Sequence, residues 1–105
     1  MRPTANPDLD NLISEITVDC HDQDEQLMGF ANAFDEISYP YPGTVIGEEV
    51  QVLSISAADD RPELIATCKR GDHTHDVALL DIAINADPDT TRLIAAYRRW
   101  TALCR

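Results

Sequence analysis

The chain has 105 residues, a hydrophobic fraction of 44%, and 19 acidic against 8 basic side chains, which gives a formal net charge of −11. This length suits one domain with a hydrophobic core, and the apolar content is too high for an acidic disordered tail. A pI near 4.3 argues against nucleic acids and anionic membrane surfaces as partners, because both attract basic patches. No apolar run is long enough to span a bilayer, and positions 1–7 lack the apolar core of a signal peptide, so we expect a cytoplasmic protein.

Two helices are predicted in the first third of the chain. An Asn-Pro pair at Pro7 is typical of a helix start. Asp22 and Glu25 have the spacing of a capping box, which favours a second helix, and this helix must end before Pro40. Gly29 in its middle is unfavourable by about 1 kcal/mol relative to Ala, so we expect a neighbouring backbone to approach it closely. The apolar stripe of the first helix is Leu9, Leu12, Ile13 and Ile16.

Short strands and a last helix complete the chain. Within 49–57 the apolar alternation changes phase after Val52, which indicates a bulge or a curled strand. Gly71-Asp72 is a two-residue hairpin turn, and Asp87-Pro88 begins the final helix. We therefore predict one α+β domain over residues 1–105, with helices at about 7–38, strands at about 44–82 and a helix at about 88–103. Short strands joined by tight turns favour closure into a small antiparallel barrel, because closure removes exposed edges.

The negative charge is concentrated in the first part of the chain. Positions 3–60 hold 13 of the 19 acidic residues and no Lys or Arg. Compaction strengthens the repulsion within such a segment, and a hard divalent cation bound by oxygen ligands would relieve it. A hard divalent cation is therefore the ligand that the charge pattern favours, with calcium as the candidate. The alternative is a solvated acidic face that maintains solubility or binds a basic protein.

The candidate ligands form two groups. One is the corner between the helices, with Asp19, Asp22 and Asp24, and the other is the end of the second helix, with Asp35 and Glu36. These groups are on the order of 20 Å apart on a straight helix, so we expect two calcium sites. The loop acids Asp59 and Asp60 would complete the shell around Asp35 if the strands fold back there.

A calcium site of the EF-hand kind does not fit these residues. In a loop that starts at Asp22, the position that requires Gly is occupied by Leu27 and the closing acid is replaced by Ala33. A nucleophile elbow and a Gly-rich phosphate loop are both missing from the sequence, so we do not expect an enzyme.

Zinc is a second possible metal. Cys68 lies close in sequence to His73 and His75, and two histidines at this spacing on a strand share one face. The opposing interpretation is that the histidines are polar strand residues near a turn. The three cysteines (Cys20, Cys68 and Cys104) are odd in number and far apart, which favours buried free thiols over disulfides.

Three segments resemble a known family: Val-Asp-Cys-His-Asp-Gln-Asp-Glu-Gln-Leu-Met-Gly-Phe, Phe-Asp-Glu-Ile-Ser-Tyr-Pro-Tyr-Pro and Val-Ile-Gly-Glu-Glu-Val-Gln-Val-Leu. Over roughly 16–80 the chain is similar to the CcbP-type proteins, which are small acidic bacterial calcium binders. The resemblance implies calcium binding without EF-hands, as a cytosolic buffer or a calcium-dependent regulator, in an α+β domain with an SH3-like barrel. It also implies a metal-binding role for Asp35, the acidic residue just before Tyr39-Pro40-Tyr41.

Overall fold

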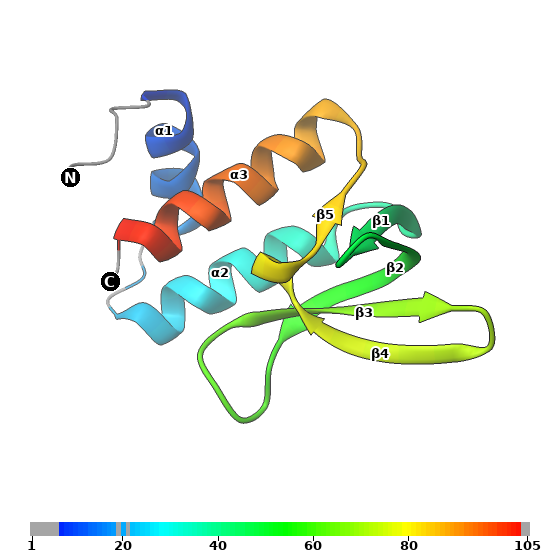
Figure 1. Cartoon of the computed structure of the whole chain (residues 1–105). Coiled ribbons are helices and arrows are strands. Elements are labelled where there is room, and N and C mark those ends of the chain that lie inside the picture. The colour runs from blue at the N-terminus through cyan, green and yellow to red at the C-terminus, as the bar shows by residue number, and fades with distance from the viewer. Residues whose placement is uncertain (1–6, 19, 21, 104–105) are drawn as a thin grey trace.

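A computed structural model describes residues 7–18, 20 and 22–103 of the chain (Figure 1). The order of elements is helix, helix, four strands, a 3-10 turn, a short strand and a helix. Their bounds are α1 Pro7–Ile16, α2 Gln23–Asp35, β1 Tyr41–Val45, β2 Glu48–Ala57, β3 Leu64–Arg70, β4 His73–Ala78, the 3-10 turn Leu79–Asp81, β5 Ala83–Ile84 and α3 Pro88–Leu103. No helix within these described ranges has the length and apolar character needed to cross a membrane.

The strands form an antiparallel sheet in the order β4-β3-β2-β1-β5. This sheet is open, with β4 and β5 at its two edges, so the predicted closed barrel is wrong. Closure was expected because it protects strand edges. Strand β5 is only two residues long and pairs with β1, so it does not bring the opposite edge strand, β4, round to close the sheet. The α+β class is confirmed, and the helices lie together on one side of the sheet (Figure 1).

The core lies between the sheet and helices α2 and α3, and it is rich in aromatic side chains. Phe30 on α2 is fully buried, and its ring packs edge-on against the ring of Tyr97. The ring centroids of Phe30 and Trp100 are 5.3 Å apart. The hydroxyl of Tyr97 accepts a hydrogen bond from the backbone N–H of Leu64 at 3.0 Å. This bond joins α3 to β3, so α3 contributes both apolar area and a satisfied polar contact to the core.

Several local predictions are confirmed. A Cβ on Gly29 would lie 2.6 Å from the carbonyl oxygen of Ile16, so α1 does approach α2 closely at this glycine. The β2–β3 register shifts between Val52 and Ser54, where the change of phase indicated a bulge. Gly71 has φ +59 in the β3–β4 turn, a conformation that glycine adopts without a steric penalty.

Helix α1 is held to α3 by two ion pairs. Arg92 binds Asp8 with Nε and Oδ2 2.8 Å apart, and Arg99 binds Asp10 with Nε and Oδ1 2.7 Å apart. The acid-rich part of the chain therefore receives counter-charge from the last helix, which the sequence alone did not indicate.

Candidate metal site

The end of helix α2 places two carboxylates side by side in sequence. Asp35 is its last residue and Glu36 is its C-cap, and both side chains are exposed. The helix dipole makes negative charge unfavourable at this end, and α2 has no basic residue in its last turn. A bound cation would offset the unfavourable helix dipole and supply the positive charge that the last turn lacks.

The backbone after Asp35 is fixed by the carbonyl oxygen of Phe34. This oxygen accepts the Tyr39 hydroxyl at 2.9 Å and the Ile37 N–H at 3.4 Å. Burial raises the pKa of Tyr39, and the nearby charge of Asp35 adds to this rise, so the phenol stays protonated and continues to donate. The Phe34 carbonyl is therefore engaged within the protein, which reduces its capacity to bind an ion.

At the corner between the helices, Asp22 acts as a helix cap. Its Oδ1 accepts the backbone N–H of Glu25 at 2.9 Å, as the capping-box spacing predicts. Asp24 and Glu25 are exposed and line a hollow of about 480 Å³ beside the end of α1. Asp19 lies outside the described residues. Since one oxygen of Asp22 caps α2, that carboxylate has reduced capacity for an ion.

The loop acids Asp59 and Asp60 follow β2. Asp60 forms an ion pair with Arg61 at 3.2 Å, and Arg61 also binds Glu63. This local cluster already balances part of the loop's negative charge. The predicted role of these two residues in completing the shell around Asp35 stays a prediction.

The described side chains supply suitable donor atoms but do not form a complete metal cage. Carboxylate oxygens are the ligands that calcium prefers, and calcium takes six to eight oxygens. Within residues 7–18, 20 and 22–103, no three His, Cys, Asp or Glu side chains are grouped closely enough to hold an ion. An ion at Asp35 and Glu36 would therefore complete its shell with backbone oxygens and water.

The predicted zinc ligands are not assembled in the described structure. Cys68 is buried, and its thiol donates to the carbonyl of Ala66 at 3.7 Å. His73 and His75 are exposed on β4. Cys20 is only partly buried, and its thiol donates to the carbonyl of Glu25 at 3.4 Å, so the expectation of a buried thiol holds for Cys68 and not for Cys20. Cys104 lies outside the described residues.

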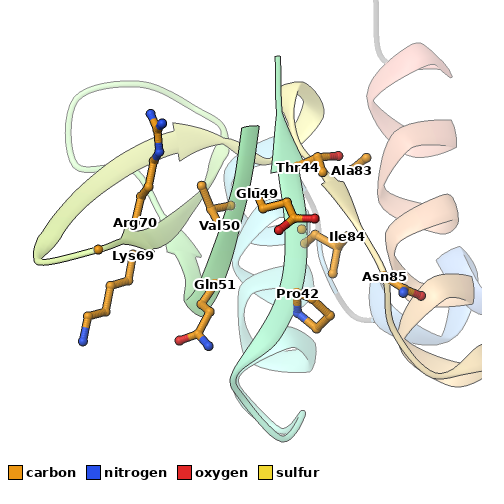
Figure 2. A pocket seen from close by; sticks show the side chains of 12 residues that line it. Pro42, Thr44, Glu49, Val50, Gln51, Lys69, Arg70, Ala83, Ile84 and Asn85 are labelled. Carbon is orange, nitrogen blue, oxygen red and sulfur yellow. The ribbon is translucent and has the colours of Figure 1, made fainter. Parts of the chain in front are cut away.

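A groove that the sequence did not indicate crosses the sheet (Figure 2). It has a volume of about 920 Å³, and strands β1, β2, β3 and β5 contribute to its walls. Its charged residues are Glu49, Lys69 and Arg70, so its balance of charge does not favour a cation.

Asp87 is a carboxylate whose hydrogen bonds the sequence predicted only in part. Its Oδ1 accepts the Tyr41 hydroxyl at 2.7 Å, and its Oδ2 accepts the Thr90 N–H at 3.1 Å as the cap of α3. These hydrogen bonds, that from Tyr41 first, lower the pKa of Asp87 to about 2. One oxygen joins the start of α3 to β1 and the other caps α3, which makes Asp87 a structural carboxylate.

Comparison with known proteins identifies the family. The model of the CcbP family, described as calcium binding, matches residues 10–101. The fold is similar to the crystal structure of CcbP from Anabaena, with a TM-score of 0.81 and 25% identity over 95% of this chain and 94% of that one. It is also similar to a calcium-binding protein solved in its calcium-binding form, with a TM-score of 0.76 and 26% identity over 92% and 91% of the two chains. No curated protein matches significantly. The chain belongs to the CcbP family of calcium-binding proteins.

Proposed function

We propose that this protein is a cytoplasmic calcium buffer whose principal site is formed by Asp35 and Glu36. The observation that carries the proposal is the pair of exposed carboxylates at the C-terminal end of α2, where the helix dipole opposes their charge. Family membership supplies the identity of the ion. A second, weaker site would use the carboxylates at the α1–α2 corner.

The arrangement of helices supports binding without an EF-hand. An EF-hand joins two helices by a loop of about 12 residues that carries the ligands. The connection 17–22 between α1 and α2 is about half as long, and α2 is followed by β1. The remaining helix, α3, comes after the sheet, so the described helices have no pair that an EF-hand loop could join.

A buffer is favoured over a regulator by the position of the carboxylates. Asp35 and Glu36 lie on the surface, whereas Phe30 and Phe34 of the same helix are fully buried against α3 and the sheet. Binding at the helix end would neutralise charge without repacking these rings. A regulator would need a calcium-dependent rearrangement that exposes a surface for a partner.

The test is a calcium titration by calorimetry at physiological ionic strength with magnesium present. We expect Asp35→Asn to weaken calcium binding by at least about tenfold, because an oxygen ligand loses its charge. Asp72→Asn is the matched control, since it removes the same charge from an exposed turn outside the proposed sites. Equal calcium affinity in the parent and in Asp35→Asn would place the principal site elsewhere.

Thermal unfolding gives an independent measurement. A ligand at 100 times its dissociation constant stabilises the folded state by about 2.7 kcal/mol, so calcium should raise the melting temperature. Sodium chloride at matched ionic strength controls for simple screening of the carboxylates. An unchanged melting curve in millimolar calcium would contradict the proposal. Amide spectra separate the two roles, since a buffer shifts signals near α2 and a regulator shifts signals across the core.

A further inference from the structure

The two histidines of β4 form an exposed pair outside every site described so far. His73 and His75 are two residues apart on an edge strand, so their side chains share one face. Their rings stack with centroids 6.4 Å apart and an interplanar angle of 30°. Neither ring has a hydrogen bond to any described residue, and ring nitrogens without partners remain available for a ligand.

The β3–β4 hairpin explains why this pair is exposed. Burial on β3 ends at Cys68, and the next two residues, Lys69 and Arg70, are exposed. His73 is opposite Arg70, beyond the buried part of β3, and His75 is opposite Cys68, the last buried residue of that strand. Both histidines are exposed at this end of the hairpin. Figure 1 shows the hairpin projecting away from the helices.

We propose that His73 and His75 form a surface site for a divalent transition-metal ion of the kind that imidazole prefers, namely zinc, copper or nickel. Two imidazoles on one tetrahedral zinc have ring centroids about 5 Å apart, given Zn–N bonds of about 2.0–2.1 Å. The observed centroid separation is 6.4 Å, and both side chains are exposed, so the rings can rotate toward a shared ion. Because no third His, Cys, Asp or Glu joins them among the described residues, water completes the coordination.

The charges around the pair permit a cation. Arg70 is the cross-strand neighbour of His73, but its guanidinium is held by Glu48 at 2.6 Å. Asp72 precedes the pair in the turn, and Asp76 follows it while accepting a hydrogen bond from Thr67 at 3.0 Å. The formal net charge of −11 adds a general attraction for cations.

This site differs in chemistry from the proposed calcium site. Calcium selects oxygen ligands, whereas imidazole nitrogen selects borderline transition metals. The site also differs from a structural zinc centre, because Cys68 is buried and does not join the histidines. The protein should therefore fold without this metal, unlike a domain that depends on structural zinc.

The experiment is a calorimetric titration of the calcium-saturated protein with zinc chloride at neutral pH. We expect one zinc site in the parent, and a loss of at least about tenfold in zinc affinity in the double variant His73→Gln/His75→Gln. Calcium affinity and the melting temperature without metal should be the same in parent and variant. Zinc binding should also weaken in acid, because protonated imidazole does not bind metal.

Two control variants locate the site. His21→Gln removes the remaining histidine, and Cys20→Ser removes the partly exposed thiol. Both should keep the parent's zinc affinity. Unchanged zinc binding in the double variant would overturn the proposal, and so would its loss in Cys20→Ser or His21→Gln. The calcium titration is scored separately, so failure of one proposal leaves the other to be judged by its own result.

Discussion

The guanidinium of Arg99 in the last helix is bound to the carboxylate of Asp10 in the first, with Nε and Oδ1 2.7 Å apart. Arg92, two helical turns earlier, binds Asp8 in the same manner. These two arginines therefore lie against the acid-rich half of the chain. Part of the repulsion among the carboxylates, which a bound cation was expected to relieve, is therefore relieved within the protein by these arginines.

Replacing both arginines (Arg92→Gln and Arg99→Gln) should lower the melting temperature at low ionic strength. The loss should shrink as sodium chloride is added, because salt screens exposed ion pairs. Thermal unfolding at two salt concentrations measures this difference. Arg70→Gln on the β3–β4 hairpin is the control. Its effect should be smaller, because Arg70 pairs with Glu48 of β2 and does not link two helices. A loss that does not depend on salt would show that packing, and not charge, is what the arginines contribute.

Gly29→Ala should destabilise the protein. The added Cβ would lie 2.6 Å from the Ile16 carbonyl oxygen, so the backbones of α1 and α2 would have to separate. Overpacking of this kind costs about 1–3 kcal/mol, which exceeds the gain of about 1 kcal/mol in helix propensity. Urea unfolding gives the free energy directly. Asn32→Ala, at an exposed position on the same helix, should stabilise instead, and a stabilised Gly29→Ala would refute the close approach.

Tyr41→Phe should raise the pKa of Asp87 from about 2 toward its ordinary value, because the hydroxyl is the main group that lowers it. A lowered pKa in the folded state stabilises the protein above about pH 4, and this stabilisation is lost as the pH falls toward 2. The stability difference between parent and variant should therefore be largest above pH 4 and shrink in acid. Carboxyl NMR titration of Asp87 checks the pKa, and urea unfolding at several pH values checks the stability. An unchanged titration of Asp87 would contradict the role of Tyr41.

Ile46→Asn should stabilise the protein by about 1 kcal/mol. Ile46 has φ +49 in the β1–β2 turn and is 96% exposed, so it has left-handed strain without any burial in return. Asn adopts this conformation readily and is common in such turns. Thermal and urea unfolding measure the gain. Gly47→Ala, at φ +78 in the same turn, should have the opposite effect, and destabilisation by Ile46→Asn would mean that Ile46 makes a contact that the structure does not contain.

The sequence predicted the elements that depend on local chemistry. Asp22 caps α2 and Gly71 turns the β3–β4 hairpin. Helix α1 begins at Pro7 and α3 at Pro88, as the Asn-Pro and Asp-Pro patterns indicate. The first strand was placed too late, at about 44 instead of Tyr41, because two prolines made the preceding segment look irregular. Pro42 is tolerated there, and its carbonyl accepts the Asn85 N–H at 2.9 Å.

The features that the sequence missed depend on residues far apart in the chain. Arg99 and Asp10 are separated by 89 positions, and no periodic pattern relates them. The open sheet could not be inferred either, because it depends on which strands pair, and spacing along the chain does not give that pairing. The same limit applies to the calcium ligands. Spacing places Asp35 at the end of a helix, but it does not say which oxygens from other segments lie nearby.

The buried bond between Tyr97 and Leu64 has a consequence for synthesis on the ribosome. Phe30 leaves the exit tunnel well before α3, and its ring then lacks Tyr97 and Trp100 as packing partners. The strongly acidic early segment would also lack Arg92 and Arg99 at that stage. Its mutual repulsion should keep the nascent chain expanded and soluble, and the core can be completed only after α3 has emerged.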